Sequence, residues 1–434
     1  MDLAIVDFSE LSEEEIRKKL SPEKKVLSEF HEAERKAAGI IEDVLNHGDE
    51  ALLKYTRIYD SVDLKRENIE VSSSEIERFS SGFDETFIEA LKVSIKRVGE
   101  FHRQDIPSDW FFKDEYGNRL GQRYLPIEKV GIYIPGGKAL YPSSVVMTAV
   151  PAMVAGVRRL ILSSPPSSYR EPSEICLAAK LVGGIDRFYR VGGVQIIAAM
   201  AFGTETVEKV DKIVGPGNIY VAAAKKLLYG VVDIDMIAGP SEVVVVWDGS
   251  SNVQFAAADV LAQAEHDEDA RAICIVFNMG HAEKLKRAIN ELFSRIERKV
   301  VAEKSLARNG RIFVVRNRDA AVALINEIAP EHLEIMTENA EEYLDEIRNA
   351  GAVFIGDYSP VAIGDYIAGP SHVLPTGGTA RFFSPLSVRS FFKSSSIIEI
   401  TPRGCEELGQ FASIIAEKEK LNAHRDSIKI RRSD

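Results

Sequence analysis

Half of the eight histidines in this sequence stand near acidic or amide side chains, in four segments that are far apart along the chain. The segments are Gln263-Ala264-Glu265-His266, Pro330-Glu331-His332, Asp365-Tyr366 with Ser371-His372, and Glu419-Lys420-Leu421-Asn422-Ala423-His424. Imidazole and carboxylate groups are common zinc ligands, and they are also the usual proton carriers of enzymes. One Glu-His pair indicates little, but four such segments together predict a metal site beside an acid–base pair, and hence an enzyme.

Two candidate residues, Gln263 and His266, lie three positions apart at the end of an expected helix. Side chains at this spacing project from one helix face, which suits two ligands of one metal ion. Taken alone, a polar cluster at a solvent-exposed helix end is the simpler interpretation.

Glu331 and His332 follow a proline that fits the first turn of a helix, so we expect both near the positive N-terminal end of that helix. A carboxylate beside an imidazole provides two bases with different pKa values, which suits a reaction that moves protons in more than one step. A helix-capping glutamate with an incidental histidine explains the pair equally well.

Asp365 and His372 flank a Gly-Pro pair, so we expect them on a loop, where α/β proteins build sites. The alternative is a turn aspartate and a surface histidine. Glu419 and His424 are five positions apart, which would put them on different faces of one continuous helix. A break near Asn422 is therefore expected, with a solvated helix face as the alternative.

Glycine-rich turns recur in the sequence. They are Pro135-Gly136-Gly137, Gly192-Gly193-Val194-Gln195 and Gly215-Pro216-Gly217-Asn218. The last two follow expected strands and open expected helices, where backbone N–H groups can hold a phosphate. None matches Gly-x-Gly-x-x-Gly with a later ribose-binding acid, so the usual dinucleotide fingerprint is absent.

Short apolar strands alternate with helices from about residue 128 onward and would position these residues. The expected strands are 129–134, 159–162, 188–191, 212–214, 242–246, 272–276, 311–315 and 352–355, and the expected helices are 143–155, 174–181, 194–202, 219–228, 253–265, 281–293 and 320–328. This alternation predicts two doubly wound, Rossmann-like α/β domains with parallel sheets. Residues 11–105 are expected to be helical, beginning with a capped helix at Ser12, and the tail from about 387 should end in helices over 406–418 and 423–428.

Composition and charge narrow the function classes. A chain of 434 residues predicts two or more domains, and a net charge of −12 argues against nucleic acid or an anionic membrane as the main partner. The three cysteines, Cys176, Cys274 and Cys405, form no spaced pair, which is typical of a reducing compartment. No signal peptide and no apolar run of about 18–20 residues is seen, so we expect a cytoplasmic protein.

From about residue 20 to its end, the sequence resembles the histidinol dehydrogenase family. The resemblance is carried by ordered blocks at 130–137, 202–206, 210–218, 238–242, 263–267, 329–333 and 372–376. One departure is Ser371, where many members carry asparagine; it neighbours the expected site without being a ligand. The resemblance implies oxidation of L-histidinol to L-histidine through an aldehyde, the last step of histidine biosynthesis, with two NAD⁺ consumed and one zinc ion per subunit.

The resemblance also implies roles for individual residues. The implied zinc ligands are Gln263, His266, Asp365 and His424, and the implied base pair is Glu331 and His332. The implied substrate contacts are Ser241, Gln263, His266, His332, Asp365, Glu419 and His424. The implied NAD contacts are Tyr133, Gln195 and Asn218. The family is homodimeric, with Glu419 and His424 reaching the site of the partner subunit.

The expected division of the chain follows from this resemblance. It comprises an N-terminal helical segment (1–25), a first α/β domain with the metal and base residues (26–131 and 241–386), a second, NAD-binding α/β domain (132–240), and a C-terminal tail that reaches the partner (387–434).

Two other classes of function stay open. A zinc hydrolase could use the same ligands and a nearby glutamate to activate water, although His-Glu-x-x-His is absent and a hydrolase would not need the second α/β domain. A non-catalytic nucleotide-binding protein would leave the Glu331–His332 pair without a purpose.

Overall fold

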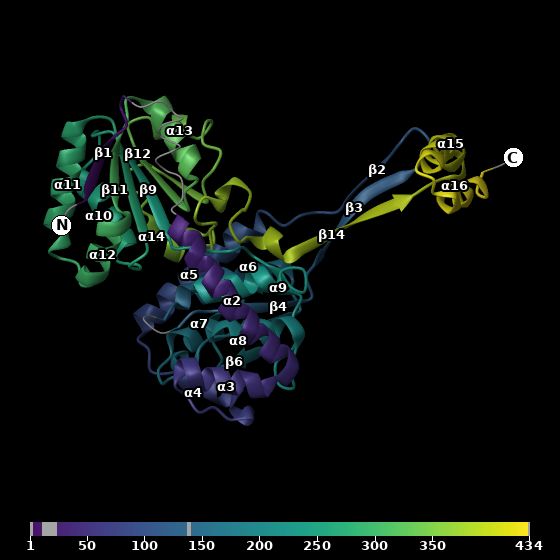
Figure 1. Cartoon of the computed structure of the whole chain (residues 1–434), viewed down its shortest axis with the longest axis horizontal. Helices are drawn as coiled ribbons and strands as arrows, with labels where there is room; N and C mark the ends of the chain where they lie inside the picture. The colour runs from purple at the N-terminus through teal and green to yellow at the C-terminus, as the bar shows by residue number, and fades with distance from the viewer. Residues whose placement is uncertain (1–2, 11–23, 137–139, 433–434) are drawn as a thin grey trace.

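The computed structural model describes residues 3–10, 24–136 and 140–432. It consists of two parallel sheets covered by helices, from which a long arm projects (Figure 1). The fold is the mixed α/β class expected from the alternating pattern. In the part of the chain that the structure describes, no helix is both long and apolar enough to cross a membrane.

The larger sheet has six parallel strands in the order β1-β11-β10-β9-β12-β13. Its strands are β1 (Ala4–Asp7), β9 (Glu242–Trp247), β10 (Arg271–Val276), β11 (Arg311–Val314), β12 (His332–Met336) and β13 (Ala352–Ile355). Alternate residues of the valine run in β9 pack on opposite faces, because side chains alternate along a strand. One face is covered by α10 (Val253–Ala264), α11 (Met279–Phe293) and α12 (Lys299–Asn309), and the other by α13 (Arg318–Ile328).

The smaller sheet has five parallel strands in the order β6-β5-β4-β7-β8. They are β4 (Lys129–Tyr133), β5 (Arg159–Ser163), β6 (Arg187–Tyr189), β7 (Lys212–Val214) and β8 (Asp233–Ile234). One face is covered by α6 (Pro142–Ala155) and α7 (Glu174–Val182), and the other by α8 (Gly193–Phe202) and α9 (Ile219–Leu228).

The N-terminal helices pack on the smaller sheet. They are α2 (Lys24–His47), α3 (Asp49–Asp60), α4 (Ser73–Phe79) and α5 (Glu85–Arg103). Apolar residues of α2 and α3 join the core beneath α8 and α9, so our grouping of residues 26–131 with the larger sheet is wrong. The helix expected to begin at Ser12 lies outside the described residues, and Ala4–Asp7 form a strand that we did not expect.

The arm is built from two distant segments. Strands β2 (Trp110–Lys113), β3 (Arg119–Pro126) and β14 (Phe392–Glu399) form an antiparallel sheet, and α15 (Pro402–Lys418) and α16 (Asn422–Lys429) lie at its tip (Figure 1). The two C-terminal helices confirm the expected ones. The three strands were missed, because most of their side chains are exposed and show no apolar alternation.

A short link joins the carboxyl edge of the smaller sheet to the amino edge of the larger one. Residues 235–241 run from the carboxyl end of β8 to the amino end of β9, and seven extended residues span at most about 25 Å. The carboxyl edge of the smaller sheet therefore lies near the amino edge of the larger one.

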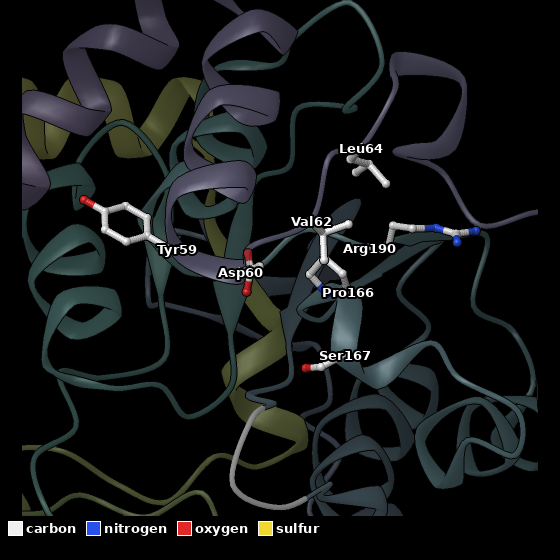
Figure 2. A pocket seen from close by; sticks show the side chains of 7 residues that line it. All are labelled: Tyr59, Asp60, Val62, Leu64, Pro166, Ser167 and Arg190. Carbon is white, nitrogen blue, oxygen red and sulfur yellow. The ribbon is translucent and has the colours of Figure 1, made fainter.

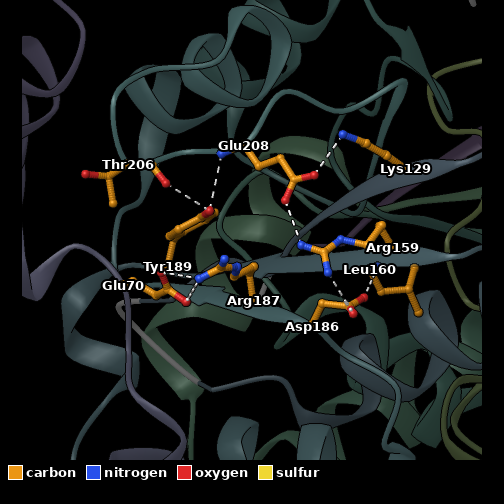
Figure 3. Close-up of polar contacts among 9 residues, drawn as sticks. All are labelled: Glu70, Lys129, Arg159, Leu160, Asp186, Arg187, Tyr189, Thr206 and Glu208. Atoms are coloured by element: carbon orange, nitrogen blue, oxygen red, sulfur yellow. Dashed lines mark hydrogen bonds and ion pairs between the residues drawn. The ribbon is translucent and has the colours of Figure 1, made fainter.

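The opposite, amino edge of the smaller sheet is occupied by ion pairs. Lys129 and Arg159, the first residues of β4 and β5, both contact Glu208 at 2.8 Å, and Arg187 at the start of β6 contacts Glu70 at 2.6 Å (Figure 3). The charged side chains at the starts of these three strands are therefore engaged with one another or with Glu70 and Glu208.

Candidate active site

Glu331 and His332 lie at the amino edge of the larger sheet, next to the start of β9. The backbone N–H of Glu242 donates to Glu331 Oε2 at 2.8 Å, and His332 Nδ1 donates to the carbonyl oxygen of Glu242 at 3.1 Å. The first residue of the neighbouring strand thus fixes both side chains. Ser241, directly before it, is half-buried at the same edge.

Our expectation of a helix beginning at Pro330 is wrong. Helix α13 ends before this point, Ala329 adopts a left-handed conformation with φ 51°, and the chain enters β12 at His332. The left-handed residue reverses the chain so that Glu331 and His332 meet the start of β9 and not a helix end. Glu331 and His332 therefore do not lie in the first turn of a helix.

The free nitrogen of His332 is buried and faces Asp365. With Nδ1 bonded to a carbonyl oxygen, Nε2 has no hydrogen-bond partner among the described residues, and it lies 3.4 Å from Asp365 Oδ1. Burial alone would lower the pKa of His332, but the carboxylates of Glu331 and Asp365 outweigh it and raise the pKa to about 9.

Glu331 is fully enclosed beside His332. Its Oε2 lies 3.6 Å from His332 Nδ1, and burial raises the pKa of its carboxyl group to about 7 although His332 opposes the shift. A carboxyl group that exchanges its proton near neutral pH is suited to general acid–base work.

Gln263, His266 and Asp365 gather near the same edge. Gln263 belongs to the last turn of α10, and its buried Nε2 has no hydrogen-bond partner within the described ranges. His266 lies just beyond the helix, with its N–H donating to the Gln263 carbonyl at 3.2 Å. Burial lowers the pKa of His266, while the negative charge of nearby Asp365 opposes this shift.

Asp365 lies in a π-helical turn, Gly364–Ala368, and not on an irregular loop as expected. His372 supports it from behind: His372 Nδ1 donates to the Asp365 carbonyl at 3.0 Å, while its Nε2 lies 3.1 Å from Ser144 Oγ. Both nitrogens of His372 are therefore engaged, which makes it a positioning residue.

Glu419 and His424 are not brought to this cluster within one chain. Both are exposed at the tip of the arm, where α15 ends, Lys420 takes φ 62°, and α16 begins at Asn422 (Figure 1). The expected helix break is confirmed. Among the described residues, no three His, Cys, Asp or Glu side chains form a group able to hold a metal ion.

The expected NAD contacts lie at the carboxyl edge of the smaller sheet. Tyr133 ends β4 and accepts a bond at its hydroxyl from Gly193 N–H at 3.3 Å. Gln195 in the first turn of α8 is buried, with both amide atoms unpartnered in the described structure. Asn218 caps α9 through bonds from the N–H groups of Tyr220 and Val221.

A pocket of about 440 Å³ opens beside this edge (Figure 2). Its lining comes from the end of α3, the turn after β5 and the residue after β6: Tyr59, Asp60, Val62, Leu64, Pro166, Ser167 and Arg190. Ligands of parallel α/β sheets bind at carboxyl edges, so the position is typical of a nucleotide pocket.

Sequence reasoning missed Glu242, the residue that organises the catalytic edge. Besides its backbone bonds to Glu331 and His332, its buried carboxylate accepts from Gly377 N–H at 2.9 Å and pairs with Arg271 at 3.0 Å. The available signal was a charged residue at the head of a run of four valines, since a buried strand seldom includes a charge without a partner.

Comparisons with known proteins agree with this arrangement. The family model described as histidinol dehydrogenase matches residues 23–432. Histidinol dehydrogenase of Carboxydothermus hydrogenoformans is 46% identical over 98% of this chain and 99% of its own length, and that of Aquifex aeolicus is 46% identical over 93% of each.

A solved structure is similar over the whole fold, arm included. The crystal structure of histidinol dehydrogenase from Elizabethkingia anophelis matches with a TM-score of 0.90 at 35% identity, covering 99% of this chain and 98% of that one. With a family match over nearly the whole sequence and relatives of almost equal length, the chain belongs to the histidinol dehydrogenase family.

Proposed function

We propose that this chain oxidises L-histidinol to L-histidine in two NAD⁺-linked steps, at the amino edge of its larger sheet. The observation that carries the proposal is the buried, unpartnered Nε2 of His332, which faces Asp365 with Glu331 behind it. Membership of the family, whose relatives are named histidinol dehydrogenase, supplies the substrate.

The two bases divide the proton transfers. His332 Nε2 accepts the proton of the substrate alcohol as the aldehyde forms, and it releases this proton to solvent before the next step. Glu331 then draws a proton from the water that adds to the aldehyde, and His332 accepts the proton that the resulting hydrate gives up. NAD⁺, when bound near Tyr133, Gln195 and Asn218, would supply the acceptor for one hydride in each of the two steps. The bond from Nδ1 to the Glu242 carbonyl keeps Nε2 as the nitrogen that reacts.

The residues present fit a zinc ion. Gln263 has a buried amide nitrogen without a hydrogen bond, and His266, three residues further on, interacts electrostatically with Asp365, so one chain would offer three nitrogen or oxygen donors. Zinc, when bound, supplies positive charge that holds and orients the substrate. A cation bound to Asp365 would also offset the negative charge that raises the pKa of His332. The lower pKa would favour the neutral form of His332, which can accept a proton.

A homodimer would complete the ligand set through the arm. His424 is the fourth proposed ligand and Glu419 a proposed substrate contact, and both are exposed at the arm tip. Apolar side chains are exposed beside them, with Phe411, Ile414 and Ile415 at 57–60%. Exposed apolar surface on a projecting element is typical of a protein interface, which supports docking of the arm on a partner subunit.

The test is to count NADH formed per histidinol consumed, with His332→Asn as the control for contaminating activity. Two NADH per histidinol are expected. One NADH or none would contradict the proposal. A zinc hydrolase would form no NADH at all, and nothing in the site favours that class.

A further inference from the structure

The pocket beside the smaller sheet has one feature that the proposed reaction leaves unused: the carboxylate of Asp60. Asp60 is the last residue of α3 and is half-buried in the pocket wall. Among the described residues it makes no hydrogen bond and no ion pair. Neighbouring charges differ in this respect, because Asp63 pairs with Arg57, and Arg190 pairs with Glu75 at 2.5 Å.

A half-buried carboxylate loses part of its hydration, and without a hydrogen-bond partner this loss raises the free energy of the ligand-free protein. Burial raises the pKa of Asp60 to about 6, so the group is still mainly charged at neutral pH. Such a group is suited to a ligand that donates hydrogen bonds.

The shape of the pocket fits the nucleoside half of a dinucleotide. Polar and apolar groups share its walls about equally, with the Tyr59 ring on one side of the Asp60 carboxylate and Val62 and Pro166 on the other (Figure 2). A flat base needs such walls, and a volume of about 440 Å³ lies within the range for small-molecule sites.

The pocket lies at the end of the molecule that is remote from the catalytic edge. Helix α3 and β6 are far from β9 and β12 in Figure 1. Tyr133, a proposed NAD contact at the end of β4, has a hydroxyl that feels the negative charge of Asp60. Asp60 therefore lies close enough to a proposed NAD contact for its charge to act there, and with nicotinamide at the amino edge of the larger sheet the adenosine is the part of the dinucleotide that would reach Asp60.

Arg190 is poorly placed to hold a phosphate in the same pocket. Its guanidinium points away from Asp60 (Figure 2) and is engaged by Glu75, whose pKa is lowered to about 2 although its burial opposes the shift. A 2′-phosphate in this pocket would therefore face the free carboxylate of Asp60, while the terminal nitrogen of Arg190 is already paired with Glu75.

We propose that Asp60 accepts a hydrogen bond from the adenosine 2′-hydroxyl of NAD, and that it thereby selects NAD over NADP. The inference rests on the proposed function, since it presumes an NAD-linked reaction. In common dinucleotide-binding folds the ribose acid follows the second strand of the sheet. Here the acid comes from a helix that precedes the sheet, which explains why the usual fingerprint is absent.

The experiment measures binding of NAD, NADP and 2′-deoxy-NAD by titration calorimetry to the wild-type protein, Asp60→Asn and Asp63→Asn. Asp60→Asn keeps the size of the side chain and removes only its charge. Asp63→Asn is the matched control, because Asp63 lies on the same segment but outside the pocket. Circular dichroism checks that each variant is folded.

Asp60→Asn should weaken NAD binding about tenfold, since a hydrogen bond to a charged group is lost. The affinity for NADP should stay the same or improve in Asp60→Asn. The affinities of the wild type and Asp60→Asn for 2′-deoxy-NAD should agree within about twofold, because this ligand lacks the 2′-hydroxyl that donates to Asp60. Asp63→Asn should bind all three ligands as the wild type does.

Equal losses for NAD and 2′-deoxy-NAD, or unchanged NAD binding in Asp60→Asn, would overturn the ribose assignment. In that event, wild-type protein that still forms two NADH per histidinol would leave the proposed function standing. A wild-type protein that binds no dinucleotide and forms no NADH would refute both.

Discussion

The proposed site draws on two regions that differ in nearly every physical respect. The cluster at the larger sheet is buried, its side chains are held by backbone groups of neighbouring elements, and burial together with nearby charges shifts its pKa values. The arm tip is exposed, and Glu419 and His424 have no such supports. The cluster has the properties of an active site within one chain, whereas the role proposed for the arm requires a partner subunit.

Under the proposed homodimer, this difference shows why exposure within one chain is a poor guide to function. An exposed histidine on a polar helix face has, within one chain, the appearance of ordinary surface. Its projection on a long arm with exposed Phe411 and Ile415 is what separates it from ordinary surface. Substitutions in the buried cluster and on the arm test this difference.

The largest expected effect comes from removing one proposed zinc ligand in either region. Asp365→Ala in the cluster and His424→Ala on the arm should each lower kcat by about 10³-fold or more, because zinc sites rarely tolerate loss of a ligand. Zinc should fall from about one per chain in both variants when measured by atomic absorption.

Glu265→Ala is a suitable control, since Glu265 lies between two proposed ligands without being one. If His424→Ala kept full zinc and near-normal turnover, the arm would have no part in the site. The same result for Asp365→Ala would remove it from the ligand set.

The next effect separates the two bases of the cluster. Glu331→Gln keeps size and the bond from Glu242 N–H but cannot take a proton from water, so aldehyde oxidation should fall about 10²-fold while alcohol oxidation changes far less. His332→Asn should harm both steps. The half-reactions are followed by stopped-flow NADH absorbance with histidinol and histidinal as separate substrates.

The pH profile provides a second check on Glu331. Its pKa is raised to about 7, so its basic form, and with it aldehyde oxidation, should decline as the pH falls below about 7. Glu331→Gln should lack this limb. Equal loss of both half-reactions in Glu331→Gln would contradict the division of roles.

Much of the fold could be predicted from the sequence, because buried strands such as β9 and β10 are uninterrupted apolar runs bounded by turns. The exception, β12, includes His332 and Glu334 on one face, two buried polar residues that interrupt the apolar pattern. His332, one of the two proposed bases, is thus among the residues that concealed this strand.

The arrangement of the site could not be predicted from local pattern. Glu242, Glu331 and Asp365 are brought together by strand order and by the turn at Ala329, neither of which has a signal in periodicity. Family resemblance provided the residues, and the structure adds that the proposed base pair lies at the amino edge of one sheet while the proposed NAD contacts lie at the carboxyl edge of the other.

A smaller effect tests whether arm and cluster belong to different subunits. Asp365→Ala and His424→Ala proteins, each nearly inactive, are mixed under conditions that allow subunits to exchange. In a mixed dimer with shared sites, one site has both defects and the other has neither. Random exchange should restore roughly a quarter of wild-type activity, since half the dimers are mixed and half of their sites are intact.

Exchange is verified by mass spectrometry of differently labelled chains, and wild-type protein taken through the same procedure sets the reference. Mixed dimers without restored activity would show that His424 acts within its own chain, or not at all.

The smallest expected effect concerns the three cysteines. None of them takes part in the reaction if Glu331 and His332 have the proposed roles. Aldehyde oxidation through a thiohemiacetal needs a thiolate, and thiolates form where the pKa is lowered. Here burial raises the pKa of Cys176 to about 11 and raises that of Cys274 still further, while Cys405 lies on the arm helix α15.

Replacing all three cysteines with alanine should therefore leave kcat within about twofold of wild type, because none serves as the nucleophile. The two buried substitutions should cost about 1 kcal/mol each in stability, seen as a lower Tm, so activity is compared at a temperature where circular dichroism shows the variant folded. A folded but inactive triple variant would revive the covalent route and would move the second oxidation away from Glu331. Retained activity would leave the second step to the two bases of the buried cluster, with Glu331 activating water and His332 accepting the second proton.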